Sequence, residues 1–202
     1  MDTPAFYLWF DTEYTSLDLD TARIMQAALM ITDTALKRVG PGIDLVVSLP
    51  PDEFVQSWIE KNASELLQRC RQGGLGVEEV DARLSRHVDE QIGPPAREVS
   101  RRPVLAGNSV HADWLLMRRF LPLLAQRINY RLLDVTALKL QWQQRRGNRE
   151  TKEVVNKDDP EFLRRYFPEA ELLSGRGQHD AYYDIQASAA ELAFYRAHLF
   201  RS

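Results

Sequence analysis

The chain has 202 residues, of which 44% are hydrophobic and 27% are charged, and its formal net charge is −3. These values are typical of one ordinary globular domain that can bury a substantial core. A negative net charge argues against a general binder of long nucleic-acid duplexes, because such proteins need a positive field. It does not exclude an enzyme that holds a few phosphates through metal ions and local basic residues.

Cysteine content and the N-terminal residues exclude further classes. Cys70 is the one cysteine, so the chain cannot form an internal disulfide or a thiolate zinc cluster, and we expect Cys70 to be a small apolar helix residue. The opening Met1-Asp2-Thr3-Pro4 does not resemble a secretory signal, and no apolar stretch approaches the length of a membrane span. We therefore expect a soluble, cytoplasmic protein that forms a single domain over residues 1–202.

The first quarter of the chain predicts three strands. Phe6 to Phe10 is apolar throughout, which suits a strand buried on both faces. Ile24 to Thr32 is rich in apolar residues, and Ile43 to Leu49 ends at Pro50-Pro51, where a ladder cannot continue. Gly40-Pro41-Gly42 predicts a hairpin turn between the second and third strands.

From Val55 onward the hydrophobic period becomes helical. Val55 to Arg71 and Val77 to Ile92 predict helices, the second of which is closed by Gly93-Pro94-Pro95. Pro103 to Asn108 predicts a short buried strand, and the helix after it carries an apolar stripe that begins at Leu116.

The remaining third alternates strand and helix. Tyr130 to Val135 predicts a strand, Thr136 to Arg145 a helix, and about Asp180 to His198 a last helix. The polar stretch Arg146 to Asp159 predicts a mobile or inserted segment, and Gly175-Arg176-Gly177 a flexible loop. Three opening strands, followed by strands that alternate with helices, predict an α/β fold with a mixed sheet covered by helices.

Asp11-Thr12-Glu13 stands at the end of the first buried strand. Side chains two residues apart on a strand point to the same face, so Asp11 and Glu13 would project together and Thr12 would face away. Two ionised carboxylates repel each other, and a divalent cation is the usual remedy. The pattern alone is weak evidence, because Asp159-Pro160-Glu161 has the same spacing where we expect only the opening of a helix.

Asp113 falls in the first turn of its predicted helix, which Ser109 would cap. It stands three residues before Leu116 and therefore lies on the inward stripe. The positive end of the helix is an equally good reason for a carboxylate there. A strand-loop-helix junction beside the first strand would bring Asp113 to the same carboxylate cluster.

His179 and Asp184 cannot share one face of a helix, because five residues span roughly 500°. They converge if His179 lies in the preceding loop, Asp180 is the N-cap and Asp184 lies one turn inside the helix. A histidine placed there can act as the base toward a bound water, since the free pKa of histidine lies near neutrality. The competing interpretation of His179, taken alone, is a solvated side chain in a loop.

The other histidines and one further aspartate have simpler interpretations. We read His87, His111 and His198 as ordinary helix residues, although His111, two residues before Asp113, is the one of these that could touch a substrate. Asp134, at the end of a predicted strand, is expected to be the N-cap of the helix that follows.

Taken in order, these segments resemble the DEDDh group of 3′-to-5′ exonucleases and, most closely, the oligoribonucleases. The matching segments are Trp9-Phe10-Asp11-Thr12-Glu13-Tyr14-Thr15-Ser16-Leu17, Gly107-Asn108-Ser109 with Asp113 and Arg118-Arg119-Phe120-Leu121, Tyr130-Arg131-Leu132-Leu133-Asp134-Val135, and His179-Asp180-Ala181-Tyr182-Tyr183-Asp184-Ile185 with Ser188 and Ala190-Glu191-Leu192. Four ordered matches over nearly the whole chain are specific. The resemblance implies a ribonuclease-H-like mixed sheet, three antiparallel strands then parallel strands, flanked by helices.

The resemblance also implies a reaction: hydrolysis of short RNA from its 3′ end to mononucleotides. Asp11, Glu13, Asp113 and Asp184 would bind two divalent cations, Mg²⁺ or Mn²⁺. His179 would take the proton of the attacking water.

Substrate contacts and an oligomeric state follow from the same resemblance. Leu17 would be a wedge between the two terminal bases, and Ser109, Arg131 and Thr136 would face the 5′ phosphate of a short single-stranded RNA. Tyr130 would come from a neighbouring subunit, which implies a homodimer.

Departures from the family bear on substrate length and not on the metal ligands. Oligoribonucleases have a histidine in the helix after the third strand, and Trp58 to Leu66 contains none. A pair of hydroxyl residues is replaced by Thr136-Ala137, which removes one phosphate donor. The first-motif neighbours Thr12, Tyr14 and Ser16 also differ, and Arg146 to Asp159 is unlike the family.

Two alternatives stay open. The first keeps the chemistry but changes the substrate to longer RNA 3′ ends or single-stranded DNA, which would need a basic track on the surface. Candidates for that track, otherwise solvated charges, are Arg97, Arg101, Arg102, Arg145, Arg146, Arg149, Arg164 and Arg165. The second is a catalytically silent nucleic-acid-binding or dimerisation domain, although such a module needs no general base.

Overall fold

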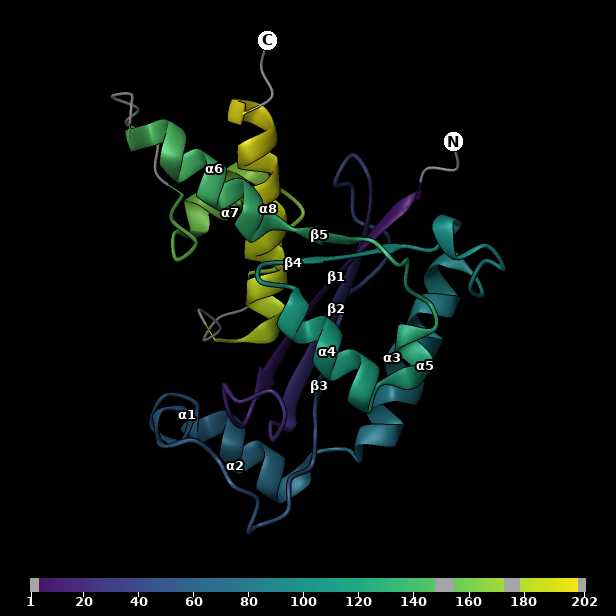
Figure 1. The fold of residues 1–202 in the computed structure, drawn as a ribbon, viewed down its shortest axis with the longest axis vertical. Helices are drawn as coiled ribbons and strands as arrows, with labels where there is room; N and C mark the ends of the chain where they lie inside the picture. The colour runs from purple at the N-terminus through teal and green to yellow at the C-terminus, as the bar shows by residue number, and fades with distance from the viewer. Residues whose placement is uncertain (1–3, 148–154, 173–178, 200–202) are drawn as a thin grey trace.

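The computed structural model describes residues 4–147, 155–172 and 179–199, and its centre is a five-stranded sheet in the order β3-β2-β1-β4-β5 (Figure 1). The strands are β1 (Phe6–Tyr14), β2 (Ile24–Asp33), β3 (Ile43–Val46), β4 (Val104–Gly107) and β5 (Leu132–Asp134). β1, β2 and β3 pair antiparallel, whereas β4 pairs parallel with β1 and β5 pairs parallel with β4. The predicted mixed sheet is confirmed.

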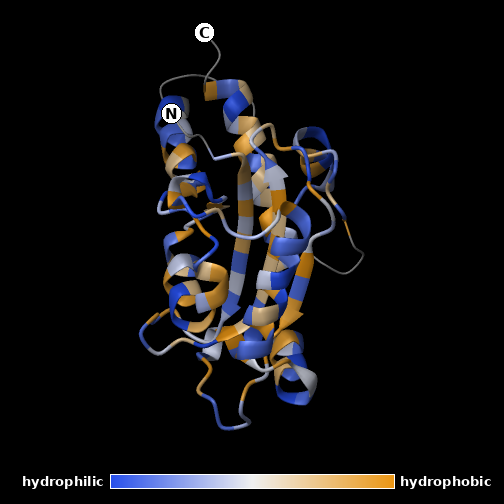
Figure 2. Ribbon diagram, turned by 90° about the vertical axis from the view of Figure 1, so that its right-hand side faces the viewer, coloured by the Kyte–Doolittle hydropathy of each residue, from blue (hydrophilic) through white to orange (hydrophobic). Residues whose placement is uncertain are grey.

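Helices cover both faces of this sheet (Figure 1). One layer contains α6 (Val135–Gly147), α7 (Pro160–Tyr166) and α8 (Ala181–Leu199), and the other contains α3 (Val77–Ile92), α4 (His111–Phe120) and α5 (Pro122–Ala125). At one end, α1 (Ser57–Asn62) packs on α2 (Ser64–Gly73), which contacts β2 and β3. A 3-10 turn, Val99–Arg101, precedes β4. Figure 2 shows hydrophilic and hydrophobic residues alternating along the flanking helices, as expected for helices with one face buried.

β1 is buried on both faces, as its unbroken apolar run predicts. Trp9 packs with the layer that contains α8, whereas Leu8 and Phe10 pack with the layer of α3, α4 and α5, and all three side chains are 0% exposed. Burying a side chain of this size contributes roughly 1.5–3 kcal/mol. The indole N–H of Trp9 donates to Oγ1 of Thr32 at 3.0 Å, so no polar group is left unpaired there. β1 is therefore a rigid central element that can hold side chains at its C-terminal end in fixed positions.

The hairpin between β2 and β3 is confirmed, but its turn was predicted in the wrong place. The chain reverses at Asp33, whose backbone N–H donates to the carbonyl of Lys37 at 2.8 Å, with Leu36 in a left-handed conformation (φ 69°). Gly42 serves packing instead, because a Cβ there would lie 2.4 Å from the ring of Tyr182. The Asp33 carboxylate accepts hydrogen bonds from two turn amides and stabilises the reversal without a glycine.

Several element boundaries also differ from the prediction. The helix predicted from Val55 to Arg71 is two helices that meet at Ala63, where the backbone leaves the helical conformation (φ −124°, ψ 34°). The third and fifth strands are shorter than predicted, ending at Val46 and beginning at Leu132. None of the described helices is long and apolar enough to span a membrane.

The predicted mobile segment is described only in part. Residues 148–154, and the glycine loop at 175–177, lie outside the described residues. Residues 155–159 contact α8, because the hydroxyl of Tyr183 donates to the carbonyl of Lys157 at 2.5 Å. As predicted, Asp159-Pro160-Glu161 opens a helix, with the Asp159 side chain accepting from the backbone N–H of Glu161 at 2.9 Å.

Candidate active site

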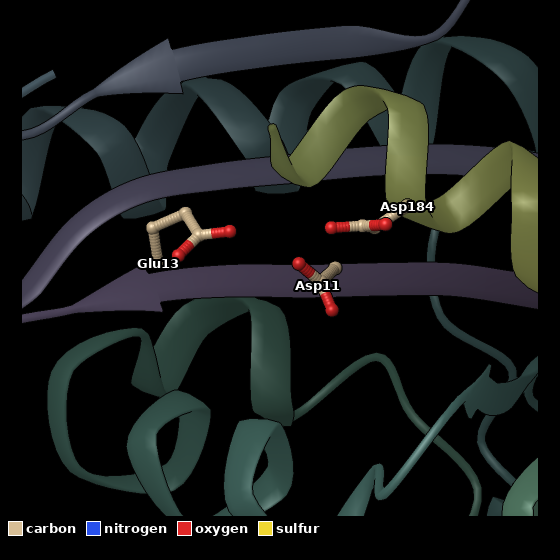
Figure 3. A group of neighbouring side chains, drawn as sticks. All are labelled: Asp11, Glu13 and Asp184. Carbon is tan, nitrogen blue, oxygen red and sulfur yellow. The ribbon is translucent and has the colours of Figure 1, made fainter. Parts of the chain in front are cut away.

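Three carboxylates meet where β1 passes the start of α8 (Figure 3). Asp11 and Glu13 come from β1, and Asp184 comes from the first turn of α8. One oxygen of each lies within 4.8 Å of an oxygen of the others. The two-residue spacing on a strand thus places Asp11 and Glu13 on one face, as predicted.

Asp113 stands beside this group, in the first turn of α4, and only 4% of it is exposed. Its Oδ1 accepts hydrogen bonds from the backbone N–H of Thr12 at 2.9 Å and from the hydroxyl of Thr12 at 2.7 Å. Asp113 lines the same pocket as the other three carboxylates, but it is not a member of their 4.8 Å group. The sequence predicts only that Thr12 faces away from Asp11 and Glu13. In the structure, Thr12 is the residue that anchors Asp113.

Ser109 does not cap α4, so this prediction was wrong. Ser109 has a left-handed backbone (φ 51°), and no side chain caps the helix. Its backbone N–H instead donates to Oδ1 of Asp134 at 3.0 Å and to Oγ1 of Thr136 at 2.9 Å. Asp134 also accepts from the backbone N–H of Thr136 at 2.9 Å, and therefore caps α6 as predicted.

His179 and Asp184 converge in the arrangement that their spacing requires. His179 lies in a turn just before α8 with a left-handed backbone (φ 64°), and its backbone N–H donates to Oδ2 of Asp184 at 3.1 Å. Asp180 caps the helix, because its Oδ1 accepts from the backbone N–H of Tyr183 at 3.1 Å. The imidazole contacts the Trp58 ring edge-on, with ring centroids 5.5 Å apart.

The carboxylates strongly perturb one another. Burial, then the charges of Asp113 and Asp184, raises the pKa of Asp11 well above its usual range. Burial, then Asp184 and Asp113, raises the pKa of Glu13 to about 7. Burial also raises the pKa of Asp113 to about 7, although the hydrogen bonds from Thr12 oppose the rise.

These raised pKa values share a physical cause, which a bound divalent cation would remove. Each shift records the cost of holding negative charge close to other negative charge in a partly dehydrated place, and a divalent cation removes that cost. Every donor in the group is a carboxylate oxygen, the ligand type that hard divalent cations prefer. The cluster therefore fits divalent metal binding.

A cavity of about 600 Å³ opens over the cluster. It is lined by Asp11, Thr12, Glu13, Tyr14, Leu17, Gln56, Trp58, Ile59, Asn62, Ala63, Asn108, Ser109, Ala112, Asp113, His179 and Asp184. Leu17 is 72% exposed and Trp58 is 55% exposed, so two large apolar side chains face solvent at the pocket that contains the carboxylates. Such a pocket can hold flat apolar groups above a charged floor.

The remaining predicted substrate residues divide into two groups. Ser109 lines the pocket, and its Oγ lies 3.3 Å from Oγ1 of Thr136. Tyr130 and Arg131 are exposed and do not line the described pocket; the Arg131 guanidinium lies 4.5 Å from the centre of the Tyr130 ring. The structure thus brings Ser109 to the pocket of its own chain with Thr136 behind it, but brings neither Tyr130 nor Arg131 there.

The arginines considered as a basic track, and otherwise expected to be solvated charges, do not reach the pocket in the part of the chain that is described. Arg101 pairs with Glu98, and Arg102 binds backbone carbonyls near the far end of the sheet. None of the candidate arginines whose side chains are described lines the cavity.

Lys157 is the functional candidate that sequence reasoning missed. Its charge lowers the pKa of both Asp11 and Asp184, against the larger effect of burial. Its Nζ lies 2.8 Å from Oε2 of Glu191, a fully buried residue of α8. No local pattern marks Lys157, because it stands in the polar stretch between α6 and α7.

Comparison with known proteins identifies the family. The model of the RNase T family, described as exonuclease, matches residues 8–192. An oligoribonuclease from Alkalilimnicola ehrlichii is 31% identical over 96% of this chain and 89% of its own length, and a probable oligoribonuclease from Schizosaccharomyces pombe is 30% identical over 95% of this chain and 67% of its own.

Solved structures of low sequence identity share the fold. Exonuclease I from Methylocaldum szegediense superposes with a TM-score of 0.63 at 17% identity, over 96% of this chain and 41% of its own. Cell-death related nuclease 4 superposes with a TM-score of 0.62 at 14% identity, over 98% of this chain and 65% of its own. The sheet and its flanking helices are thus the ribonuclease-H-like architecture that the resemblance implies. The chain belongs to the RNase T exonuclease family and, within it, to the oligoribonucleases.

Proposed function

We propose that this protein is a 3′-to-5′ exoribonuclease that degrades short RNA to mononucleotides by metal-dependent hydrolysis. One observation carries the proposal: three carboxylates lie within 4.8 Å of one another beneath a pocket that His179 also lines. The oligoribonuclease relatives support short RNA as the substrate class, and the exonuclease family supports the reaction.

Asp11, Glu13 and Asp184, with Asp113 beside them, would hold two Mg²⁺ or Mn²⁺ ions. Divalent cations bound there would lower the pKa of a water and stabilise the charge that develops on the phosphate. Thr12 holds Oδ1 of Asp113 through two hydrogen bonds and so fixes the orientation of this carboxylate beside the cluster.

His179 is the general base in this proposal. It stands in the pocket wall five residues before Asp184, and its backbone is tied to that carboxylate at 3.1 Å. The edge-on contact with Trp58 limits the positions of the imidazole. A water held at the carboxylates would give its proton to the imidazole as its oxygen attacks the phosphorus of the terminal phosphodiester. The bond from that phosphorus to the 3′ oxygen of the preceding nucleotide would break, and the released 3′ oxygen would take up a proton from solvent.

Leu17 and Trp58 are the proposed contacts for bases. Apolar and aromatic surfaces accept any base by stacking, because every base has a π-face. Ser109 and Thr136 offer hydroxyl donors toward the 5′ phosphate of a short substrate. The absence of described pocket-lining arginines favours short RNA over a long strand, which would need a basic track.

A homodimer is part of the same proposal. Tyr130 is 63% exposed and lies outside its own pocket, as expected of a residue that serves a partner's site. Exposed large apolar side chains also occur on α4, α5, β5 and α6, namely Leu115, Leu123, Leu132 and Leu140. β5 is an edge strand, and a second copy of the chain would cover these residues.

The cytoplasmic location and the single domain over residues 1–202 stay predictions.

A time course on 5′-labelled RNAs of two to ten nucleotides, with Mg²⁺ and Mn²⁺ compared, tests the proposal. We expect loss of one nucleotide at a time, fastest on the shortest RNAs, and no reaction in excess EDTA. A flat rate across RNA lengths, or equal cleavage of single-stranded DNA, would favour the longer-substrate alternative. Degradation of no oligonucleotide with Mn²⁺, or equal degradation in excess EDTA, would defeat the proposal of a metal-dependent nuclease. The first of these results would favour the silent binding domain.

A further inference from the structure

Lys157 makes an ion pair behind the pocket wall. Its Nζ lies 2.8 Å from Oε2 of Glu191; the Glu191 side chain is 0% exposed and that of Lys157 is 19% exposed. The backbone carbonyl of Lys157 accepts a hydrogen bond of 2.5 Å from the hydroxyl of Tyr183. Both the side chain and the backbone of Lys157 are therefore tied to α8, the helix that carries Asp184.

Glu191 connects this ion pair to the pocket. The same oxygen, Oε2, accepts a hydrogen bond of 2.7 Å from the side-chain amide of Asn108, and Oε1 accepts one of 2.6 Å from the hydroxyl of Tyr195. Asn108 lies between β4 and α4 and lines the cavity together with Asp113. A cation, a buried carboxylate and an amide thus form a continuous series of polar contacts from residue 157 to the pocket wall.

Lys157 is the group that makes an ionised Glu191 tolerable. Burial alone would raise the pKa of Glu191, but the charge of Lys157 and the hydrogen bonds from Asn108, Lys157 and Tyr195 outweigh it, so the pKa is lowered. Without Lys157 the carboxylate becomes either an unpaired buried charge or a protonated acid. A protonated acid has a donor of its own and fewer acceptor positions, so the contact with the Asn108 amide weakens once Glu191 takes up a proton.

We propose that Lys157 is a positioning residue of the active site, which acts through Glu191 to hold Asn108 in the pocket wall where the RNA backbone passes. This inference rests on the proposed function. It gives a role to a residue of the polar stretch between α6 and α7. Asn108 is the member of this series that lines the pocket, and Lys157 acts on its position through Glu191.

Lys157→Met is the decisive variant, because it keeps the apolar stem and removes the charge. Lys157→Arg restores a cation, and Lys37→Met is the matched control in the exposed turn that follows β2. We expect Lys157→Met to lower kcat/KM by about 10-fold to 100-fold, the usual effect of losing a residue that orients a site from behind. Lys157→Arg should keep most of the activity, and Lys37→Met all of it.

Two further measurements separate positioning from a general loss of structure. If Lys157 acts through Asn108, the double variant Asn108→Ala/Lys157→Met should be no slower than Asn108→Ala alone. Mn²⁺ binding, measured by calorimetry, should be unchanged or tighter in Lys157→Met, because a positive charge that acts on Asp11 and Asp184 is removed. A damaged pocket would instead bind Mn²⁺ more weakly.

A readout that needs no turnover keeps this test independent of the proposed function. In ¹⁵N-labelled protein, the Asn108 side-chain amide resonance is assigned by its disappearance in Asn108→Ala. It should shift in Lys157→Met and return toward its original position in Lys157→Arg, even if the wild-type protein degrades no RNA.

Several results would overturn the inference: an unshifted Asn108 resonance, wild-type kinetics in Lys157→Met, additive losses in the double variant, or weakened Mn²⁺ binding. If Lys157→Met does not fold, Glu191→Gln/Lys157→Met takes its place, because this pair buries no unpaired charge. The Asn108 resonance and the coupling to Asn108→Ala are then interpreted in the same way.

Discussion

Replacing Glu13 with glutamine removes one of the three carboxylates that crowd the end of β1. Burial, then the charges of Asp184 and Asp113, raises the pKa of Glu13 from 4.5 to about 7 in the metal-free protein. Between these pH values the folded protein keeps a proton that the unfolded chain has released, so the free energy of unfolding falls as the pH rises. The loss is complete above pH 7, where a shift of this size amounts to roughly 3 kcal/mol.

Glu13→Gln should therefore stabilise the metal-free protein while it weakens metal binding and activity. In EDTA, the two proteins should unfold at similar temperatures near pH 4, where Glu13 is protonated in both the folded and the unfolded chain. The advantage of the variant should grow through pH 5 to 7 and reach about 6–12 °C at pH 8, since 1 kcal/mol corresponds to about 2–4 °C for a chain of this size.

Thermal unfolding followed by circular dichroism from pH 4 to pH 8, with EDTA or with Mn²⁺, checks this prediction. Glu65→Gln, which removes a carboxylate at an exposed position on α2, is the control and should give no comparable gain in stability at pH 8. Mn²⁺ should reverse the order at pH 8, because the intact cluster gains more from the cation. A variant that is no more stable than wild type at pH 8 in EDTA, or whose advantage does not grow with pH, would refute the crowding argument.

Four other substitutions test the remaining roles. His179→Ala should keep its circular dichroism spectrum and lose about 10²-fold or more in kcat, as for a lost general base; wild-type kcat would exclude that role. Asp11→Asn should weaken both Mn²⁺ binding by calorimetry and turnover, and unchanged binding would remove Asp11 from the ligand set. Thr12→Val deletes the 2.7 Å hydrogen bond that lowers the pKa of Asp113, so this pKa should rise above about 7 and Mn²⁺ binding should need a higher pH. The same pH dependence of Mn²⁺ binding in the variant and in wild type would contradict this. Tyr130→Ala and His179→Ala, each impaired alone, should regain activity when mixed and refolded together, because a mixed dimer holds one complete site, and no recovery would argue against a shared site.

Local patterns were sufficient to predict most of the fold. An apolar run such as Phe6–Phe10 keeps its side chains from water only if both faces of the strand are covered. In the structure its residues pack into the cores on both sides of the sheet. Side-chain direction along a strand repeats every two residues, which places Asp11 and Glu13 together whatever surrounds them. The same kind of local rule, helix capping, placed Asp180 and Asp134 correctly.

Contacts between distant segments could not be read from those patterns. Thr12 anchors Asp113 across 101 positions of the chain, and Lys157, before α7, pairs with Glu191 inside α8, because the tertiary fold brings these segments together. Ser109 has the residue type of an N-cap, yet its backbone amide is drawn to Asp134 on the neighbouring strand. Residue type and spacing thus decided which groups can bind a cation and on which face of β1 they stand. Only tertiary packing decided how strongly these groups repel one another and which neighbours hold them, because desolvation and Coulomb energy depend on distances that no local period encodes.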